Sequence, residues 1–280
     1  RTLVFLKGCP LRCLWCSNPE SQEAAPQLAY NADKCLGCGR CVATCPQQAL
    51  RLEQDGIHRD RERCDPACRA CAEVCPGQAL TFYGKTMTAR EVLDKVEEDA
   101  AFYARSGGGL TLSGGEPLQQ GDFCLSILEE AEHRAVHTAM ESCGQAPEET
   151  ILAACGKLDY LLFDIKHLDS EAHKKATGMG NERILRNLAA VRSAYPHLPI
   201  HLRTPLIPGI NDDEELIRRI VELARSMDAV HYELLPYHRM GEQKYRFLGR
   251  EYPYGGPAQV DAGILARLRG IVEEVFPEKD

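Results

Sequence analysis

The 280-residue sequence contains no run of 18 apolar residues, no recognisable signal peptide and no excess of basic residues. The first two absences argue against a membrane-spanning helix and a secretory leader, so the cytoplasm is the expected compartment. A formal net charge of −8 argues against a nucleic-acid-binding surface, which normally carries a basic patch. The chain also lacks an initiating methionine. It begins at Arg1, inside an apolar strand-like run, so we expect a short N-terminal piece to be missing.

Hydrophobic residues at 44% and charged residues at 26% are ordinary globular values, which suit one large domain or a barrel with an insert.

Cysteine is the residue type that the sequence has in excess. Of the fourteen cysteines, eleven fall in ordered groups between Cys9 and Cys75, a pattern typical of metal ligation. A disulfide framework would need an oxidising compartment and a small chain. Cys124, Cys143 and Cys155 stand alone, and we expect Cys124 and Cys155 to fill helix faces.

The first cysteine group is Cys9, Cys13 and Cys16, spaced C-x3-C-x2-C directly after the apolar run Leu3 to Leu6. Three thiolates can hold three irons of a [4Fe–4S] cluster and leave the fourth iron without a protein ligand. An open iron is a place where a small molecule can be activated. The alternative is a structural zinc site, which normally uses four ligands, and no fourth Cys or His lies at a matching distance.

A second block of cysteines, from about residue 30 to residue 83, contains an internal repeat. The repeat reads Cys35-x2-Cys38-x2-Cys41-x3-Cys45-Pro46 and then Cys64-x3-Cys68-x2-Cys71-x3-Cys75-Pro76. The first half is the bacterial two-cluster ferredoxin run, in which the fourth cysteine serves the other cluster. We therefore predict one [4Fe–4S] cluster on Cys35, Cys38, Cys41 and Cys75, and a second on Cys64, Cys68, Cys71 and Cys45. The extra residue in Cys64-x3-Cys68 departs from the ferredoxin spacing. Two zinc knuckles are the alternative, and the paired Cys-Pro endings count against them.

From Thr86 onward the pattern alternates between helices and strands. A capping box, Thr88 to Glu91, opens a helix that the glycines at 107–109 end. Further helices are predicted at about 122–134, 147–155, 182–194, 211–226 and 258–276. Strands are predicted at 3–6, 110–112, 136–140, 160–163, 200–206 and 230–235. Six strands alternating with six helices indicate a parallel sheet with right-handed crossovers. The pattern alone leaves a flat doubly wound sheet and an incomplete barrel equally open.

Polar residues follow the predicted strands, at the edge of a parallel sheet where chemistry usually gathers. They are Gly114-Gly115-Glu116, Glu141-Ser142, Asp164-Ile165-Lys166, Arg203, and Pro236-Tyr237-His238. One polar group per strand end, all facing one mouth, would suit the binding of a polar cofactor.

The spacing C-x3-C-x-aromatic-C, with Trp15 as the aromatic residue, resembles the signature of the radical S-adenosylmethionine (SAM) enzymes. The run from Arg1 to Cys13, followed by Trp15 to Glu20, resembles the glycyl radical enzyme activating enzymes that carry a ferredoxin-like insert. This resemblance covers essentially the whole chain. It implies an α/β fold, a partial (β/α)6 TIM barrel formed by residues 1–29 and 84–280. A ferredoxin-like domain would be inserted at residues 30–83.

The resemblance also implies cofactors and roles for individual residues. The cofactors are SAM and three [4Fe–4S] clusters, of which the Cys9, Cys13 and Cys16 cluster would chelate SAM. The remaining SAM contacts would come from Gly114, Gly115 and Glu116 at the α-amino group, Asp164 and Lys166 at the methionine moiety, Arg203 in the pocket, and His238 near the adenosine. Trp15 would pack beside the cluster or the adenine, and Asn18 is a weaker candidate. Glu141 and Ser142 match the family positions that seat a monovalent cation. Glu141 is a longer acid and Ser142 a smaller hydroxyl residue than the family has there, so the resemblance leaves cation binding open.

The implied activity is reductive cleavage of SAM to methionine and a 5′-deoxyadenosyl radical, which takes a Cα hydrogen from a glycine of a partner enzyme. Candidate partners are choline trimethylamine-lyase, isethionate sulfite-lyase, glycerol dehydratase, benzylsuccinate synthase and hydroxyphenylacetate decarboxylase. A flavodoxin- or ferredoxin-type protein would donate electrons. Neither nucleic acid nor a membrane is expected as a partner.

Two other functions remain as alternatives. One is an electron carrier whose working part is the cysteine-rich block, and the other is a radical SAM enzyme that acts on a peptide or a small molecule. The basic and tyrosine-rich stretch from Tyr237 to Tyr254 is interpreted equally well as a docking face or as a solvated loop.

Overall fold

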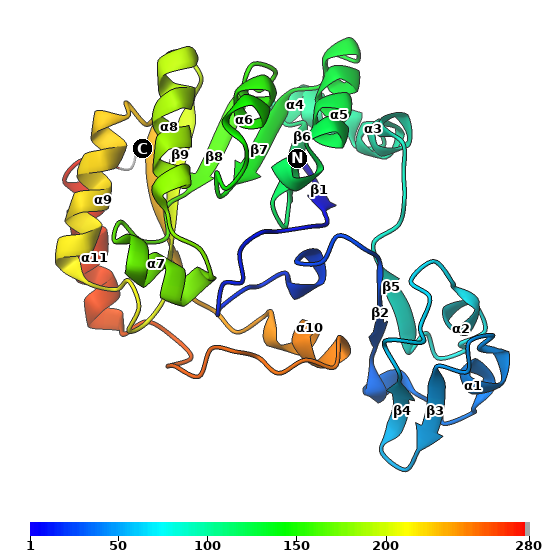
Figure 1. Cartoon of the computed structure of the whole chain (residues 1–280). Helices are drawn as coiled ribbons and strands as arrows, with labels where there is room; N and C mark the ends of the chain where they lie inside the picture. The colour runs from blue at the N-terminus through cyan, green and yellow to red at the C-terminus, as the bar shows by residue number, and fades with distance from the viewer. Residues whose placement is uncertain (278–280) are drawn as a thin grey trace.

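Six parallel strands form the central sheet of the computed structural model, which describes residues 1–277 (Figure 1). In spatial order they are β1 (Thr2–Leu6), β6 (Leu110–Gly114), β7 (Thr138–Ser142), β8 (Tyr160–Asp164), β9 (Ile200–Leu206) and β10 (His231–Pro236). All neighbouring strands run parallel, and β1 and β10 are the two edges of the sheet. Spatial order therefore follows sequence order, as the predicted partial (β/α)6 barrel requires, and the flat doubly wound alternative is wrong.

Most of the helices lie on the outer side of this sheet (Figure 1): α3 (Ala89–Glu97), α4 (Ala100–Ser106), α5 (Gly121–His133), α6 (Glu148–Cys155), α8 (Glu182–Ala194), α9 (Glu214–Ser226) and α11 (Ala262–Glu273). Two others, α7 (Ser170–Thr177) and α10 (Glu242–Phe247), lie beyond the carboxyl ends of the strands, next to the segment that follows β1. Cys124 and Cys155 are buried in α5 and α6, as predicted. None of the helices within residues 1–277 is both long and apolar enough to cross a lipid bilayer.

Strand β9 shows how side-chain alternation builds both the core and the site. Ile200, Leu202 and Leu206 are fully buried in the main hydrophobic core, which the helices share. His201 and Arg203 point to the opposite face because successive residues of a strand alternate in direction. The inner face of the barrel is therefore supplied with polar groups by the same strands that anchor the core.

Three helix predictions differ from the structure. The helix opened by the capping box at Thr88 is two helices, because α3 ends at Glu97 and Asp99 precedes α4. The Asp99 carboxylate accepts a 2.6 Å hydrogen bond from the Thr2 hydroxyl, which fixes this break against β1. Helix α9 begins at Glu214 with Asp213 as its cap, and α11 begins at Ala262, later than predicted.

The cysteine-rich segment lies to one side of the barrel (Figure 1). It consists of β2 (Gln27–Tyr30), α1 (Arg40–Thr44), β3 (Leu50–Glu53), β4 (Gly56–Arg59), α2 (Ala70–Glu73) and β5 (Leu80–Tyr83). Strand β2 pairs antiparallel with β5, and β3 pairs antiparallel with β4. Three short 3-10 turns complete the described elements: η1 (Pro19–Ser21), η2 (Ala32–Lys34) and η3 (Pro117–Gln120).

Candidate active site

The first cysteine loop, residues 7–16, is held between η1 and the end of α7 by backbone hydrogen bonds. They run from Gly8 N to Ser21 O (2.8 Å), Cys9 N to Gln22 O (3.1 Å), Arg12 N to Thr177 O (2.7 Å), and Leu14 N to Ala176 O (3.0 Å). A loop with its backbone groups paired on both sides keeps its side chains in place. The three cysteines are therefore presented from a rigid frame.

The turn after β6 packs directly on this loop. The Glu116 N–H donates to Gly8 O over 2.8 Å, and the Gly115 N–H donates to Leu6 O over 3.0 Å. A Cβ atom on Gly115 would lie 2.3 Å from Gly8 O and 2.5 Å from Ser21 O. Only glycine allows this close approach of two backbones.

A cavity of about 400 Å³ opens at the carboxyl ends of the strands, between the cysteine loop and the sheet. Its lining includes Cys9, Cys13, Trp15, Cys16, Asn18, Gly114, Gly115, Glu141, Ser142, Asp164, Lys166, Arg203 and His238. These residues come from all six strands or the segments that follow them. The structure therefore brings together every predicted site residue of the barrel except Glu116.

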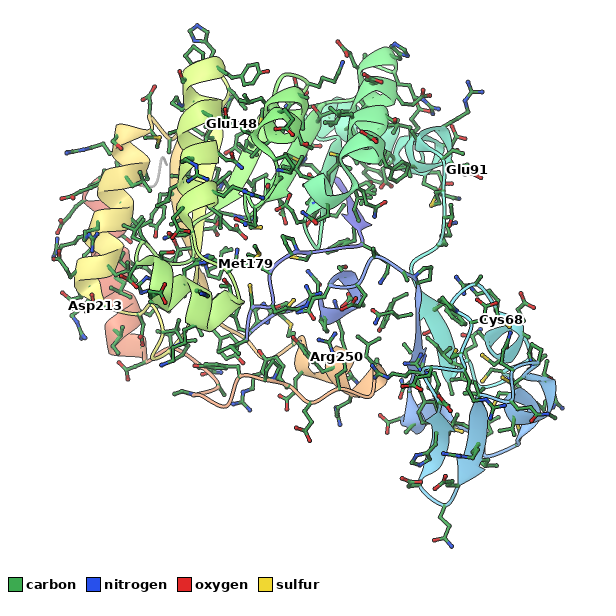
Figure 2. All side chains as sticks on the ribbon, viewed as in Figure 1. Cys68, Glu91, Glu148, Met179, Asp213 and Arg250 are labelled. Atoms are coloured by element: carbon green, nitrogen blue, oxygen red, sulfur yellow. The ribbon has the colours of Figure 1, made fainter. Side chains whose placement is uncertain are left out.

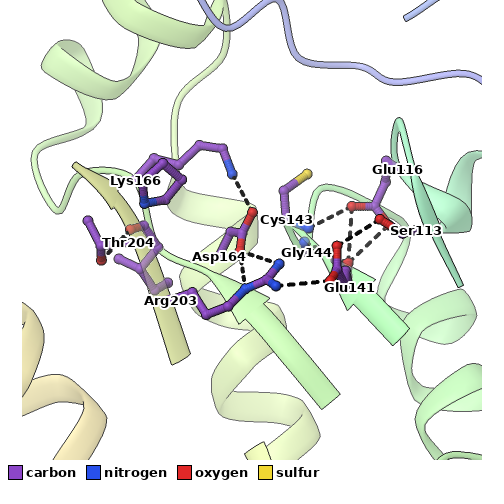
Figure 3. A network of polar contacts seen from close by, with 12 residues as sticks. Ser113, Glu116, Glu141, Cys143, Gly144, Asp164, Lys166, Arg203 and Thr204 are labelled. Carbon is purple, nitrogen blue, oxygen red and sulfur yellow. Dashed lines mark hydrogen bonds and ion pairs between the residues drawn. The ribbon is translucent and has the colours of Figure 1, made fainter. Parts of the chain in front are cut away.

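Charged side chains form one continuous network on the wall of this cavity (Figure 3). The Arg203 guanidinium lies 3.0 Å from Asp164 Oδ1 and 3.0 Å from Glu141 Oε1. Lys166 Nζ lies 3.1 Å from Asp164 Oδ2, and the Ser113 hydroxyl donates to Glu141 over 2.7 Å. Two cations and two anions balance, so the network remains polar without a large net charge.

The network favours the charged forms of Asp164 and Lys166. Burial by itself would raise the pKa of Asp164, but the positive charges of Lys166 and Arg203 outweigh burial and lower it. Burial would likewise lower the pKa of Lys166, but Asp164, together with Cys13 and Cys143, outweighs burial and raises it. Cations aimed into a partly enclosed cavity are suited to hold a carboxylate or hydroxyl groups of a ligand.

Glu116, predicted to contact SAM, does not line the cavity. Its side chain is fully buried, and the carboxylate accepts hydrogen bonds from the Ser142 hydroxyl, Cys143 N (2.7 Å) and Leu118 N. Burial raises its pKa, although these hydrogen bonds oppose the shift. The carboxylate ties the turn after β6 to the loop after β7, and only the Gly114-Gly115 backbone faces the cavity.

Glu141 and Ser142 point in opposite directions, as neighbours on a strand do. The Glu141 carboxylate joins Arg203 on the inner face of the barrel, whereas the Ser142 hydroxyl turns into the wall and donates to Glu116 over 2.9 Å. The structure does not bring these two side chains together around a common point.

Aromatic residues close the far side of the cavity. Trp15 is buried and packs in a small cluster with Tyr237, Tyr254 and Ile207. His238 is exposed at the rim. Asn18 accepts a 2.8 Å hydrogen bond from Lys244, so this side chain also helps to hold the segment that follows β10.

Three features of the site were missed in the sequence. Helix α7 supports the cysteine loop, and its signals were Asp169 as a cap and Gly178 after its end. Asn211 is not a helix cap but a fully buried bridge, because its amide donates to Lys166 O and Pro205 O. Cys143 follows Glu141-Ser142 and lines the same cavity as Cys9.

The eight cysteines of the second block line two separate hollows. Cys35, Cys38, Cys41 and Cys75 line one of them, and Cys45, Cys64, Cys68 and Cys71 line the other. Each hollow therefore contains three cysteines of one half of the repeat and the last cysteine of the other half.

No three of these sulfur atoms approach as closely as a single metal ion would hold them. Within residues 1–277, three ligand atoms of His, Cys, Asp or Glu come within 4.8 Å of one another only at Glu53, Asp55 and His58, on the surface. Four thiolates around zinc, each about 2.3 Å from the ion, would lie closer than that to one another. The sulfur atoms of the two hollows are therefore spaced more widely than the ligands of one zinc ion.

One side of the segment after β10 packs against the rest of the chain, so this segment is not a freely solvated loop. Tyr245 on α10 is 1% exposed, and Lys244 pairs with Glu20 at 2.6 Å. Arg250 donates to Gln22 over 2.7 Å, on the stretch that passes beneath the first cysteine loop (Figure 2). Arg61 of the cysteine-rich segment donates to Leu248 O and to Gly249 O (3.0 Å), which joins that segment to the barrel.

His201 provides a pH-dependent contribution to stability. It lies inside the barrel, with its ring centroid 4.6 Å from that of His231. Burial, then the charges of His231 and Arg203, lower its pKa from 6.5 to about 4, against the opposing charge of Asp164. Below pH 6.5 the unfolded chain therefore binds a proton that the folded chain refuses, so the free energy of unfolding falls as the pH falls from 6.5 towards 4.

We expect the His201→Asn variant to lose this part of the pH dependence. Urea denaturation of the wild type and the variant at several pH values between these limits measures it. The exposed His197→Asn is the matched control and should keep the slope of the wild type. Equal slopes in all three proteins would show that His201 does not contribute.

The comparisons with known proteins agree with this geometry. The profile of the Radical SAM superfamily matches residues 3–220. The isethionate sulfite-lyase activating enzyme of Desulfovibrio desulfuricans is 52% identical over 91% of this chain and 83% of its own length. The (2S)-3-sulfopropanediol sulfolyase activating enzyme of Bilophila wadsworthia is 51% identical over 96% of this chain and 89% of its own length.

A solved structure supports the fold alone. The crystal structure of Streptococcus suis SuiB with the precursor peptide SuiA has a TM-score of 0.57 to this chain. The sequences are 12% identical, and the match covers 97% of this chain and 44% of SuiB.

Proposed function

Because this chain belongs to the radical SAM superfamily, and within it to the activating enzymes of glycyl radical enzymes, we propose that it activates a sulfite- or sulfolyase of the isethionate or 3-sulfopropanediol kind. Two relatives with these activities in their names are more than 50% identical to it over nearly the whole chain. The reaction is cleavage of SAM to methionine and a 5′-deoxyadenosyl radical, which removes a Cα hydrogen from one glycine of the partner.

The observation that carries this function is the single cavity shared by the cysteine loop and the strand ends. Three cysteine side chains face a wall with two buried cations and a glycine backbone, which suits a ligand with both a carboxylate and an amino group. Cys9, Cys13 and Cys16 would hold a [4Fe–4S] cluster. When bound, that cluster supplies the low-potential electron that breaks the inert sulfonium.

The residues of the cavity wall would orient SAM and exclude water. Lys166 and Arg203 would receive the carboxylate and ribose oxygens, because Asp164 and Glu141 keep both cations charged and in place. The Gly114-Gly115 backbone would approach the amino group. Trp15 and His238 would flank the adenosine at the aromatic end of the cavity. These groups are already in place, so they need no rearrangement when the radical forms. A site that excludes water also protects the radical from side reactions.

A monovalent cation beside the SAM carboxylate could not be held by both predicted side chains. Since the Ser142 hydroxyl donates to Glu116, the ion would have to use the Glu141 carboxylate and main-chain oxygens. The Arg203 guanidinium already pairs with that carboxylate at 3.0 Å. A cation would therefore compete with the Arg203 guanidinium for the Glu141 carboxylate.

Residues 30–83 would form a ferredoxin-like domain with two further [4Fe–4S] clusters, and residues 1–29 and 84–280 would form the catalytic barrel. The crossed sets of four cysteines in the two hollows support this division. Four cysteines at each site leave no open iron for a substrate, which counts against an enzyme that binds a peptide through its auxiliary clusters. The cavity of about 400 Å³ counts against a simple electron carrier. Reduced, metal-ligating cysteines are expected in the cytoplasm.

Electron paramagnetic resonance on the anaerobically reconstituted and reduced holoprotein tests this function. We expect a glycyl radical doublet after addition of SAM and a purified isethionate or 3-sulfopropanediol lyase. A choline trimethylamine-lyase is the matched control partner and should give much less signal. Formation of 5′-deoxyadenosine without a doublet on any glycyl radical enzyme would contradict the proposed substrate class.

A further inference from the structure

The two hollows of the cysteine-rich segment lie at different distances from the barrel. The β2–β5 ribbon leaves the barrel at Gln27, whose side chain accepts a 3.5 Å hydrogen bond from Lys7, two residues before Cys9. The next residue on each strand, the register pair Leu28 and Phe82, lines the Cys45, Cys64, Cys68 and Cys71 hollow.

The register pair Tyr30 and Leu80 lines the other hollow. This pair lies two residues farther along the ribbon, a step of about 7 Å. The hollow of Cys35, Cys38, Cys41 and Cys75 is therefore the outer one, and the hollow of Cys45 lies between it and the barrel.

The outer hollow is also the one that reaches the surface. Of the eleven cysteines in the two blocks, Cys38 is the one that is exposed. The glycines on either side of it, Gly37 and Gly39, have φ values of 63° and 68°, a conformation that glycine adopts without strain. A Cβ atom on Gly37 would contact nothing within 4 Å. No side chain of the loop therefore covers Cys38 on that side.

Two large apolar side chains flank the exposed cysteine. Leu36 is 70% exposed, and Leu52, next to Gly39, is 41% exposed. We call residues 36–39 together with Leu52 the outer patch. A single exposed leucine is ordinary, but two beside an exposed metal-ligating cysteine indicate a contact surface.

The rim of the outer patch carries positive charge that is not neutralised within the chain. Lys34 and Arg40 are exposed, and within residues 1–277 neither makes an ion pair. Arg51 lies 3.7 Å from Glu53, and Asp33 precedes Lys34 in the chain, so the three cations outnumber these two acids. This rim is cationic in a chain whose net charge is −8, so it would attract an acidic partner and orient it on approach.

We propose that the outer patch is the docking surface for a small acidic flavin-containing electron carrier. This inference rests on the proposed function, since it requires a cluster on Cys35, Cys38, Cys41 and Cys75. The methyl-bearing edge of a flavin is apolar and fits against Leu36 and Leu52, while carboxylates around it face Lys34 and Arg40. The carrier is oxidised by one electron, and the iron–sulfur site that it faces is reduced by one.

Binding and electron transfer in the reconstituted holoprotein test this surface. A reduced flavodoxin and, separately, dithionite serve as donors, and calorimetry gives the Kd for the oxidised flavodoxin. Leu36→Glu should weaken binding and slow reduction by the flavodoxin about tenfold or more, because it removes apolar contact and adds like charge. Arg40→Glu should weaken binding at about 0.05 M ionic strength and much less at about 0.5 M.

Phe102→Glu is the matched control. Phe102 is 71% exposed on α4, away from the cysteine-rich segment, and this variant should behave as the wild type. Dithionite needs no docking surface, so it should reduce every variant at the rate of the wild type.

Three results would overturn the proposal: unchanged flavodoxin binding in Leu36→Glu, an equal loss in Phe102→Glu, or tighter binding of a ferredoxin than of the flavodoxin. Iron analysis separates this failure from failure of the proposed function. A wild-type holoprotein without the auxiliary iron contradicts the clusters themselves, whereas full iron with unchanged binding contradicts the docking surface alone.

Discussion

The Gly115→Ala variant is expected to lose the cluster of the first cysteine loop while keeping the two others. An alanine Cβ would lie 2.3 Å and 2.5 Å from two backbone carbonyl oxygens, Gly8 O and Ser21 O. Neither oxygen belongs to a flexible side chain, so the loop with Cys9 must move as a unit. Reconstitution should then give about eight iron atoms per chain in place of about twelve, because each [4Fe–4S] cluster contributes four.

Iron content, SAM affinity and the melting temperature measure this effect. We expect the variant to bind SAM too weakly to detect. Gly270→Ala is the matched control, because a Cβ atom there has open space and the residue lies in α11, where alanine is preferred over glycine by about 1 kcal/mol. This control should be as stable as the wild type or slightly more so. Full iron content and normal SAM affinity in Gly115→Ala would show that the backbone contact does not position the loop.

The Arg203→Ala variant is expected to destabilise the barrel and to abolish SAM binding. Removal of the guanidinium leaves Asp164 and Glu141 on the same wall, with Lys166 as the remaining cation. Removing one partner of a buried ion pair costs about 3–5 kcal/mol, because the other charge stays desolvated. Arg203→Lys should be intermediate, since an ammonium cannot reach both carboxylates as the planar guanidinium does.

Chemical denaturation of the apoprotein measures the loss of stability. Calorimetry of the reconstituted protein with SAM measures the loss of binding. Trp15 is the single tryptophan and is buried beside the site, so its fluorescence reports unfolding there. Arg267→Ala is the matched control. Arg267 pairs with Glu214 at 2.8 Å, but their side chains are 60% and 47% exposed, so its removal should have little effect. If Arg203→Ala and Arg267→Ala behaved alike, the network in the cavity would not be acting as a buried unit.

The sequence by itself predicted which cysteines group together and which segments form the strands, while the order of the strands in the sheet came from the structure. Cysteine spacing is local, so a loop of ten residues already limits which ligands can converge on one cluster. The repeated Cys-Pro endings indicated the crossed sets before any contact was known. In a strand such as Ile200 to Leu206, alternate residues face the hydrophobic core and the polar inside of the barrel. The alternation of such strands with helices along the chain leaves few possible topologies.

Tertiary structure alone decided which polar groups face the cavity. The Glu116 carboxylate and the Ser142 hydroxyl turn into the wall and bond to each other across two neighbouring strands, although Gly115 and Glu141 beside them face the cavity. Arg203, Glu141 and Asp164 are far apart in sequence and become a network only when β7, β8 and β9 lie in register. Asn211 and helix α7 act through backbone groups of distant segments. Such contacts leave no periodic pattern in the sequence, because the residues that make them become neighbours only after the chain has folded.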